Sequence, residues 1–189
     1  MFIHSVIKKS KVNGPGTRYT IWFQGCSIHC PGCANKHMWE HNKGTELSPA
    51  QLFSNVMAQK DIDGISITGG EPLDQYEDLV EFIELCRVRG VEIFLTSGHS
   101  MEEIKEKYPK ILELVDILID GPFEQDKVDD TPAWRGSTNQ GIHLLSERAK
   151  KYVGYEPEFT TEMIFKENGN ATVTGFTVPK FIKDMGEKP

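Results

Sequence analysis

The sequence predicts an α/β fold built on a parallel β-sheet. Short apolar runs alternate with amphipathic stretches of helical length as far as Asp120, and this alternation is typical of βαβ units. Several of the apolar runs end in glycine-rich or polar loops, which in a parallel sheet would share one rim. The chain of 189 residues suits one sizeable core, and its formal charge of -7 argues against a polyanion such as nucleic acid as its partner.

The first elements are a short N-terminal strand and a turn in which Gly14 and Gly16 flank Pro15. In one interpretation this turn is a surface loop, and in a sharper one Arg18 anchors it near the cysteines that follow. The remaining elements are a buried strand over 19–24, a helix opened by Ser48 and Pro49, a strand over 65–68, a helix over 75–89, a strand over 91–96, a helix over 101–108 and a strand over 114–120.

The last part of the chain differs in character. Segments 159–166 and 171–176 are predicted to form a β-hairpin around a turn that contains Gly169, and a short terminal helix from Lys180 is compatible with the sequence. We therefore divide the chain into a core over 1–150 and an extension over 151–189 that packs on the same domain. There is no apolar run of membrane-spanning length and no signal peptide pattern, which predicts a cytoplasmic protein.

Three of the four cysteines lie in one short loop. Cys26, Cys30 and Cys33 have the spacing C-x3-C-x2-C directly after an apolar run. Thiolates this close together repel one another, so the arrangement indicates a bound metal or cluster. An iron–sulfur cube held by three cysteines would keep one iron open for chemistry. Cys86 stands apart in a helical pattern and is predicted to be a small buried side chain.

A structural zinc site is the alternative interpretation of this loop. His37 extends the pattern to C-x3-C-x2-C-x3-H, a set of tetrahedral-type ligands that would make the chain an interaction module without catalysis. A module of that kind has no need of a glycine-rich strand end beside it, so the rest of the chain favours the cluster. His29 lies between the ligands as a bystander or as a donor to the cluster.

The cysteine loop should meet three other strand ends at the predicted rim. Gly69 and Gly70 leave the backbone bare where a ligand can approach closely, and Glu71 with Pro72 follows directly. A simpler role for Glu71 is to cap the next helix. The other two strand ends supply Thr96, Ser97 and Asp120.

The cysteine loop, followed in order by Gly69-Gly70-Glu71-Pro72, resembles the radical S-adenosylmethionine enzymes. The resemblance implies a 4Fe-4S cluster on Cys26, Cys30 and Cys33, whose open iron binds S-adenosylmethionine. The cluster passes one electron to the sulfonium, and a 5′-deoxyadenosyl radical results. It also implies that Gly69 to Pro72 lie at the methionyl group of the cofactor, and that Thr96, Ser97 and Asp120 lie at its ribose or carboxylate.

Within that superfamily, Gly14-Pro-Gly-Thr-Arg18 followed by Trp22-Phe-Gln-Gly-Cys26 resembles the small activases that install a glycyl radical in a partner enzyme. Two further motifs are similar to the activases of anaerobic ribonucleotide reductase: Cys30-Pro-Gly-Cys-Ala-Asn35 with Trp39 close behind, and Asp120-Gly-Pro-Phe123 with Trp134-Arg-Gly-Ser-Thr-Asn-Gln140. The family implies a partial, open (β/α) barrel and a target glycine on the large subunit of anaerobic ribonucleoside-triphosphate reductase. It further implies an electron donor of the flavodoxin or ferredoxin type. An activase for another glycyl radical enzyme, of the pyruvate formate-lyase type, is the alternative.

Overall fold

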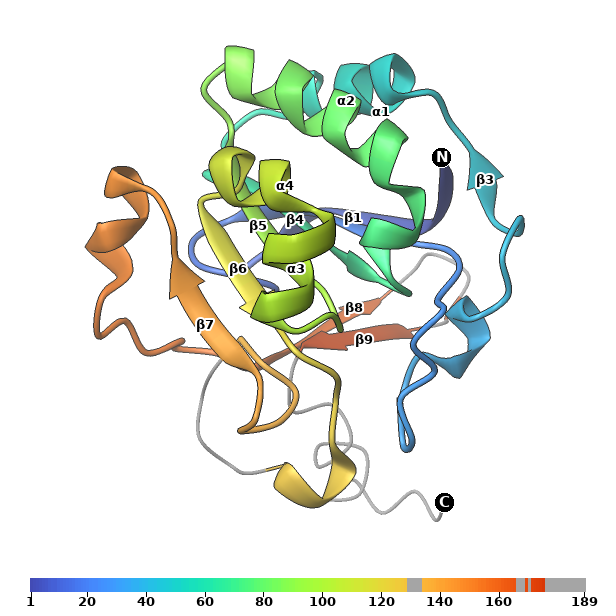
Figure 1. Cartoon of the computed structure of the whole chain (residues 1–189). Helices are drawn as coiled ribbons and strands as arrows, with labels where there is room; N and C mark the ends of the chain where they lie inside the picture. Colours follow the sequence, from blue (N-terminus) through green and yellow to red (C-terminus); the bar gives the residue numbers. More distant parts are fainter. Residues whose placement is uncertain (129–133, 166–168, 170, 176–189) are drawn as a thin grey trace.

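A seven-stranded sheet forms the centre of the chain. The computed structural model describes residues 1–128, 134–165, 169 and 171–175. The strands of the sheet lie in the order β3-β1-β2-β4-β5-β6-β7 (Figure 1). Their bounds are β1 Phe2–Ser10, β2 Arg18–Phe23, β3 Thr45–Glu46, β4 Gly64–Gly69, β5 Glu92–Thr96, β6 Ile117–Asp120 and β7 Gly141–Leu144.

The four central strands, β2, β4, β5 and β6, are parallel and adjacent in chain order. This confirms the predicted parallel sheet. Strands β1 and β3 on one flank and β7 on the other are antiparallel to their neighbours. The result is a mixed α/β fold in which βαβ crossovers build the middle and antiparallel strands extend both sides.

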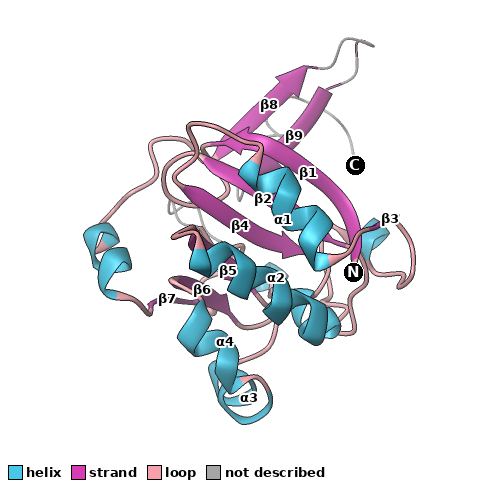
Figure 2. Cartoon of the chain, turned by 90° about the horizontal axis from the view of Figure 1, so that it is seen from above, coloured by secondary structure: helices cyan, strands magenta, loops and turns pink. Residues whose placement is uncertain are grey.

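In the part of the chain that the structure describes, four α-helices cover one face of the central strands (Figure 2). They are α1 Pro49–Met57, α2 Tyr76–Val88, α3 Met101–Lys107 and α4 Pro109–Leu114. Ser48 caps α1 through a capping box, with Pro49 at the first helical position as predicted. The sequence pattern does not predict α4, and the strand expected over 114–120 begins only at Ile117, because Pro109 opens a second short helix first.

Alternate strand residues divide the apolar side chains between two cores. Ile65 and Ile67 of β4 face the helices, and Cys86 of α2 is fully buried in that larger core, as predicted. On the other face Phe94 packs with Trp134 in a smaller cluster. Trp134 is only 4% exposed, so its role in this structure is packing.

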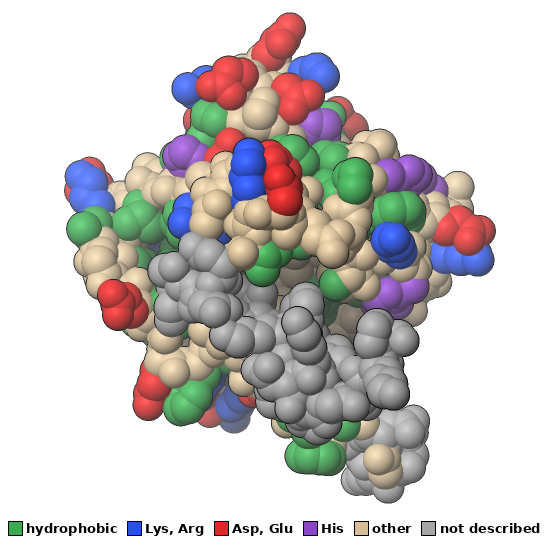
Figure 3. Space-filling view, turned by 90° about the horizontal axis from the view of Figure 1, so that it is seen from below, with side chains coloured by type: hydrophobic (Ala, Val, Ile, Leu, Met, Phe, Trp, Pro, Cys, Tyr) green, Lys and Arg blue, Asp and Glu red, His purple; other side chains and the backbone are tan. Residues whose placement is uncertain are grey.

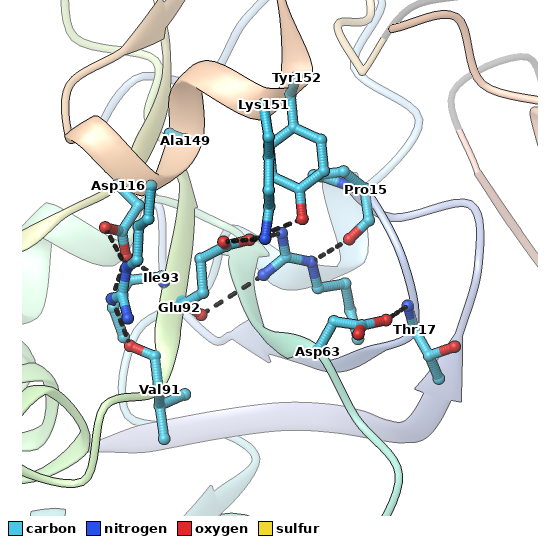
Figure 4. Close-up of polar contacts among 12 residues, drawn as sticks. Pro15, Thr17, Asp63, Val91, Glu92, Ile93, Asp116, Ala149, Lys151 and Tyr152 are labelled. Carbon is cyan, nitrogen blue, oxygen red and sulfur yellow. Dashed lines mark hydrogen bonds and ion pairs between the residues drawn. The ribbon is translucent and has the colours of Figure 1, made fainter.

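Arg18 does not lie near the cysteine loop, contrary to the sharper interpretation of the first turn. It begins β2, whereas the cysteines follow the end of that strand. The guanidinium is fully buried and pairs with Glu92 at 2.6 Å, while its Nε donates to the carbonyl of Pro15 at 2.5 Å (Figure 4). Gly64 leaves room for it, since a Cβ there would lie 2.2 Å from Arg18 Nη1. Arg18 therefore fixes the first turn at the amino end of the parallel strands.

The segment after β7 is fastened to the same end of the sheet. Tyr152 donates to Glu92 at 3.1 Å and Lys151 pairs with Glu92 at 3.0 Å. Arg148 binds Asp116 through two nitrogens, at 2.6 and 2.7 Å. Figure 4 shows the carboxylates of Glu92 and Asp116 beside the segment that follows β7. These contacts hold the 3-10 helix η4 (Glu147–Tyr152) against β5 and β6.

Beyond η4, the strands β8 (Thr161–Phe165) and β9 (Ala171–Gly175) pair antiparallel in a separate two-stranded sheet. Thr174 of β9 is hydrogen-bonded to Asn13 of the first turn at 3.0 Å. The predicted terminal helix from Lys180 lies outside the described residues. No helix in the described part of the chain is long and apolar enough to cross a membrane.

The surface seen from below carries charges of both signs. Among the described side chains in this view, Lys and Arg lie beside Asp and Glu instead of gathering into a basic patch (Figure 3).

Candidate functional site

The cysteine loop starts directly after β2 and is tied down at its beginning. The N–H of Gly25 donates to the carbonyl of Met38 at 2.7 Å, and the N–H of Cys26 donates to that of Trp39 at 3.1 Å. The carbonyl of Gly25 in turn accepts the N–H of Glu71 at 2.8 Å. The first cysteine is therefore held between the segment that follows the loop and the end of β4.

The three loop cysteines are free thiols in different surroundings. Cys26 is buried, whereas Cys30 and Cys33 are partly exposed and joined by a turn in which Cys33 N–H donates to Cys30 C=O at 3.2 Å. Burial raises the pKa of the Cys26 thiol, and nearby backbone N–H groups oppose that rise. Burial also raises the pKa of Cys30. Ligation would have to stabilise these thiolates, which a cationic iron centre does.

The three cysteines suit an iron–sulfur cluster, and the histidine of the zinc pattern has another partner. Within the residues that the structure describes, no three His, Cys, Asp or Glu side chains converge closely enough to hold one metal ion. A cube takes each cysteine on a different iron, so its ligands need not meet at one point. His37, the fourth member of the zinc set, instead packs against the His4 ring with centroids 4.9 Å apart. The three free cysteines of the loop are therefore the residues that could hold a cluster.

Gly69 and Gly70 bring the end of β4 against the cysteine loop. A Cβ on Gly70 would lie 1.9 Å from the carbonyl oxygen of Gly25, and one on Gly69 would lie 2.3 Å from the nitrogen of Phe23. Gly69 also has φ +119°, which side chains rarely adopt. The two glycines are thus required for the loop to cross this strand end, a constraint that the motif did not reveal. Their contact with a cofactor stays a prediction.

Glu71 joins the ends of β4 and β5 from a buried position. Its side chain is 1% exposed and accepts hydrogen bonds from Leu73 N–H at 2.9 Å, Ser97 Oγ at 3.0 Å and Gly98 N–H at 2.7 Å. The bond to Leu73 caps the 3-10 helix η2 (Pro72–Gln75), which confirms the simpler interpretation of Glu71, whereas its role toward a cofactor stays a prediction. Burial raises the pKa of Glu71 to about 7, although these three donors favour the charged form.

Stability should therefore depend on pH through Glu71. Its pKa is about 7 when folded against an ordinary value of 4.5, so the contribution of the protonated carboxyl is complete below pH 4.5 and is lost as the pH rises through 7. Glu71→Gln keeps a neutral group at all pH values. Between pH 5 and 7.5 the free energy of unfolding of this variant, relative to the native chain, should rise by roughly 2 to 3 kcal/mol.

Urea unfolding of the cluster-free chain over this pH range measures the difference. Glu77→Gln, on the exposed side of α2, controls for the loss of one carboxyl. Parallel stability curves for the native chain and Glu71→Gln would contradict the assignment of the slope to Glu71.

The remaining predicted residues stand at the same rim with different partners. Thr96 ends β5, and its Oγ1 is buried without a hydrogen-bond partner among the described residues. Asp120 ends β6, where its two oxygens accept from Met101 N–H at 2.7 Å and pair with His143 Nε2 at 2.6 Å. Nothing in the sequence indicates the His143 pair, because β7 brings it from 23 positions away. Thr96 Oγ1 is therefore unpaired among the described residues, while Asp120 already positions α3.

Asp74 is a site residue that the sequence motifs do not single out. Its oxygens accept hydrogen bonds from Ser27 N–H at 2.6 Å and Ser27 Oγ at 2.7 Å, directly after the first cysteine. The sequence places Asp74 two positions after Pro72, where an acidic residue near a helix start needs no further explanation. The contact spans 47 positions, so only the fold discloses it.

The Trp134 to Gln140 motif forms hydrogen bonds within itself and to the backbone that follows β6. Gln140 is 6% exposed, accepts from the N–H of Gly136 at 2.8 Å and donates to the carbonyl of Gly121 at 2.8 Å. Asn139 donates to the carbonyl of Pro122 at 2.8 Å, and Arg135 donates to that of Gln140 at 3.1 Å. The motif thereby fixes the chain that leaves the rim after β6.

Comparison with known proteins places this site in a family. Residues 12–143 match the 4Fe-4S single cluster domain. The chain is 34% identical over 153 residues to the anaerobic ribonucleoside-triphosphate reductase-activating protein of Escherichia coli (strain K12), covering 77% of this chain and 99% of that protein. It is 33% identical over 146 residues to the protein of that name from Haemophilus influenzae, covering 70% and 90%.

More distant relatives also match. The chain is 32% identical over 126 residues to the pyruvate formate-lyase-activating enzyme of Listeria monocytogenes, covering 62% of this chain and 51% of that enzyme. A crystal structure of QueE from Escherichia coli aligns with a TM-score of 0.44 and 21% identity over 52% of each chain, a likeness too weak to argue from. Because residues 12–143, more than half of this chain, match the family domain, and a relative at 34% identity is covered over 99% of its length, the chain belongs to the anaerobic ribonucleoside-triphosphate reductase-activating protein family.

Proposed function

We propose that this protein reductively cleaves S-adenosylmethionine at a 4Fe-4S cluster and generates a glycyl radical on anaerobic ribonucleoside-triphosphate reductase. The observation that carries the proposal is the contact between a loop of three free cysteines and the Gly69-Gly70 strand end. The names of the relatives that the chain matches over most of its length supply the target.

In this proposal Cys26, Cys30 and Cys33 hold the cluster. When bound, the cluster would supply the single electron that reductive cleavage of S-adenosylmethionine needs. The residues of the chain itself provide the frame. Gly69 and Gly70 let the cysteine loop lie against β4, and Pro72 starts the next turn. The free Oγ1 of Thr96 is a hydrogen-bonding group for the cofactor.

Glu71 and its partners complete that frame. The carboxylate holds Ser97 Oγ and Gly98 N–H, which fixes the loop after β5 at the rim. Asp120 fixes the start of α3 beside it. We assign all three residues, Glu71, Ser97 and Asp120, to the cofactor side of the site.

A protein substrate requires an open site, and we propose that the sheet forms a partial, open barrel that leaves the radical face accessible. Residues 1–150 would form the radical S-adenosylmethionine core and residues 151–189 an extension packed on it. The contact of Thr174 with Asn13 supports that packing. The match to the Escherichia coli relative covers 99% of that protein but only 77% of this chain. About a quarter of this chain therefore has no counterpart in that relative, which supports an added segment. We further propose a flavodoxin or ferredoxin-type electron donor and a cytoplasmic location.

Transfer of a radical to the partner tests the activity. Reduced, cluster-loaded protein is incubated anaerobically with S-adenosylmethionine and the reductase large subunit, and the glycyl radical is sought by electron paramagnetic resonance. We expect a radical on the reductase, with about four irons per chain in the activase, as a cube requires. One zinc per chain and no iron would instead support the interaction module.

The match to a pyruvate formate-lyase-activating enzyme justifies one second candidate partner. The same incubation with pyruvate formate-lyase should leave that protein without a radical. A radical on pyruvate formate-lyase and none on the reductase would reverse the assignment of the target.

A further inference from the structure

The first three residues of the cysteine loop, 25–27, are held by two kinds of hydrogen-bond acceptor. Backbone carbonyls hold the N–H groups of Gly25 and Cys26, as described above. The next N–H, that of Ser27, is held by the side chain of Asp74, which also binds the Ser27 hydroxyl at 2.7 Å. A carboxylate that accepts two hydrogen bonds from one residue fixes that residue in both position and orientation.

We propose that Asp74 is a positioning residue that fixes Cys26 for the cluster by clamping Ser27 next to it. That Cys26 is a cluster ligand rests on the proposed function. The two hydrogen bonds from Ser27 to Asp74, which we call the clamp, are present in the chain without a cluster. Within the described part of the chain, the hydrogen bonds of the Asp74 carboxylate go to Ser27 and to none of the three cysteines. Through hydrogen bonds in the described part of the chain, Asp74 therefore reaches Cys26 only by way of Ser27; its charge also acts directly on the Cys26 thiol, an effect that Asp74→Asn and Asp74→Ala remove alike.

The surroundings of Asp74 suit this role better than that of a surface ion pair. Its side chain is only 12% exposed, and His41 Nε2 lies 3.7 Å from one oxygen. Asp74 lies in η2, a few residues past Gly70, which packs directly against the carbonyl of Gly25. The clamp therefore extends from the same rigid strand end on which the loop rests.

The clamp distinguishes Cys26 from the other two ligands. Cys30 and Cys33 lie farther along the loop, are partly exposed and share a local turn. Cys26 is 8% exposed and sits between the clamped Ser27 and the strand end. Loss of the clamp should free Cys26 selectively, while the buried Cys86 in α2 remains protected.

Thiol alkylation of the full-length, reduced, cluster-free chain tests this. Iodoacetamide labelling at each cysteine is followed by mass spectrometry. In Asp74→Ala, Cys26 should react about tenfold faster than in the native chain, as expected for the loss of charge-assisted hydrogen bonds. Cys86 should stay protected. Asp78→Ala is the control: it removes a carboxylate of α2 that pairs with the N-terminal ammonium of Met1, and it should leave the rate of Cys26 alkylation unchanged.

Asp74→Asn separates position from charge. It removes the same negative charge as Asp74→Ala but keeps an oxygen that can accept from Ser27, so Cys26 should react more slowly than in Asp74→Ala. An unchanged Cys26 rate in Asp74→Ala would overturn the proposal, as would a parallel rise at Cys86 or equal rates in the two variants. A native chain that binds no cluster would instead count against the proposed function alone.

Discussion

Replacement of Cys26, Cys30 or Cys33 by alanine is expected to abolish S-adenosylmethionine cleavage and radical transfer. Each change removes one thiolate from the set of three, and the remaining cysteine, Cys86, is buried in α2 and cannot replace it. The cluster should be lost or its open site misplaced, so that cleavage falls below detection. Release of 5′-deoxyadenosine from the reduced protein, together with its iron content, measures this.

Cys86→Ala is the matched control. Cys86 lies fully buried in α2, and burial raises its pKa to about 12, so it is not a thiolate near neutral pH. The substitution should leave cleavage and iron content close to those of the native chain, with a modest loss of stability from a smaller core side chain. Retained cleavage in any of the three loop variants would remove that cysteine from the ligand set.

Arg18→Leu is expected to cause the largest loss of stability of the changes considered. Arg18 is fully buried and its partner Glu92 is 5% exposed, so the substitution leaves a buried carboxylate whose remaining side-chain partners, among the described residues, are Lys151 and Tyr152. Breaking a buried ion pair in this way costs about 3 to 5 kcal/mol. Denaturant unfolding of the cluster-free chain should show this decrease in the free energy of unfolding.

Two further variants identify the cause. Lys9→Leu breaks an exposed pair with Asp61, 3.4 Å apart, and should change stability by too little to resolve. Arg18→Leu combined with Glu92→Leu removes both buried charges, so it should be less destabilised than the sum of the single changes. If Arg18→Leu behaved like Lys9→Leu, the buried pair would not be what secures the first turn.

Local patterns in the sequence were sufficient for most elements. The alternation of apolar and amphipathic runs predicted the parallel strands, and Ser48 with Pro49 predicted the start of α1. The spacing of the cysteines and the glycines that end β4 predicted one rim, which β2 and β4 do form by pairing in register. These signals are local because helix caps, strand periodicity and turn chemistry depend on neighbouring residues.

Other features depend on which distant segments meet. Arg18 lies at the end of β2 away from the cysteines because its partner, Glu92, begins β5 74 positions later. The register of β6 with β7 sets the pair of Asp120 with His143. The sequence predicted neither contact, because each acidic and basic residue has many possible partners until the strand order is known.

Residue identity and spacing are enough to establish the chemistry available to this chain: three clustered thiols, a glycine-rich strand end and the strands that carry them to a common edge. How that chemistry is held in place depends on the folded molecule. Folding sets Gly70 against Gly25, buries Glu71 between two strand ends and brings Asp74 to Ser27. The difference arises because the type of a ligand follows from the side chain itself, whereas hydrogen-bond partners and burial follow from the packing of segments far apart in the chain.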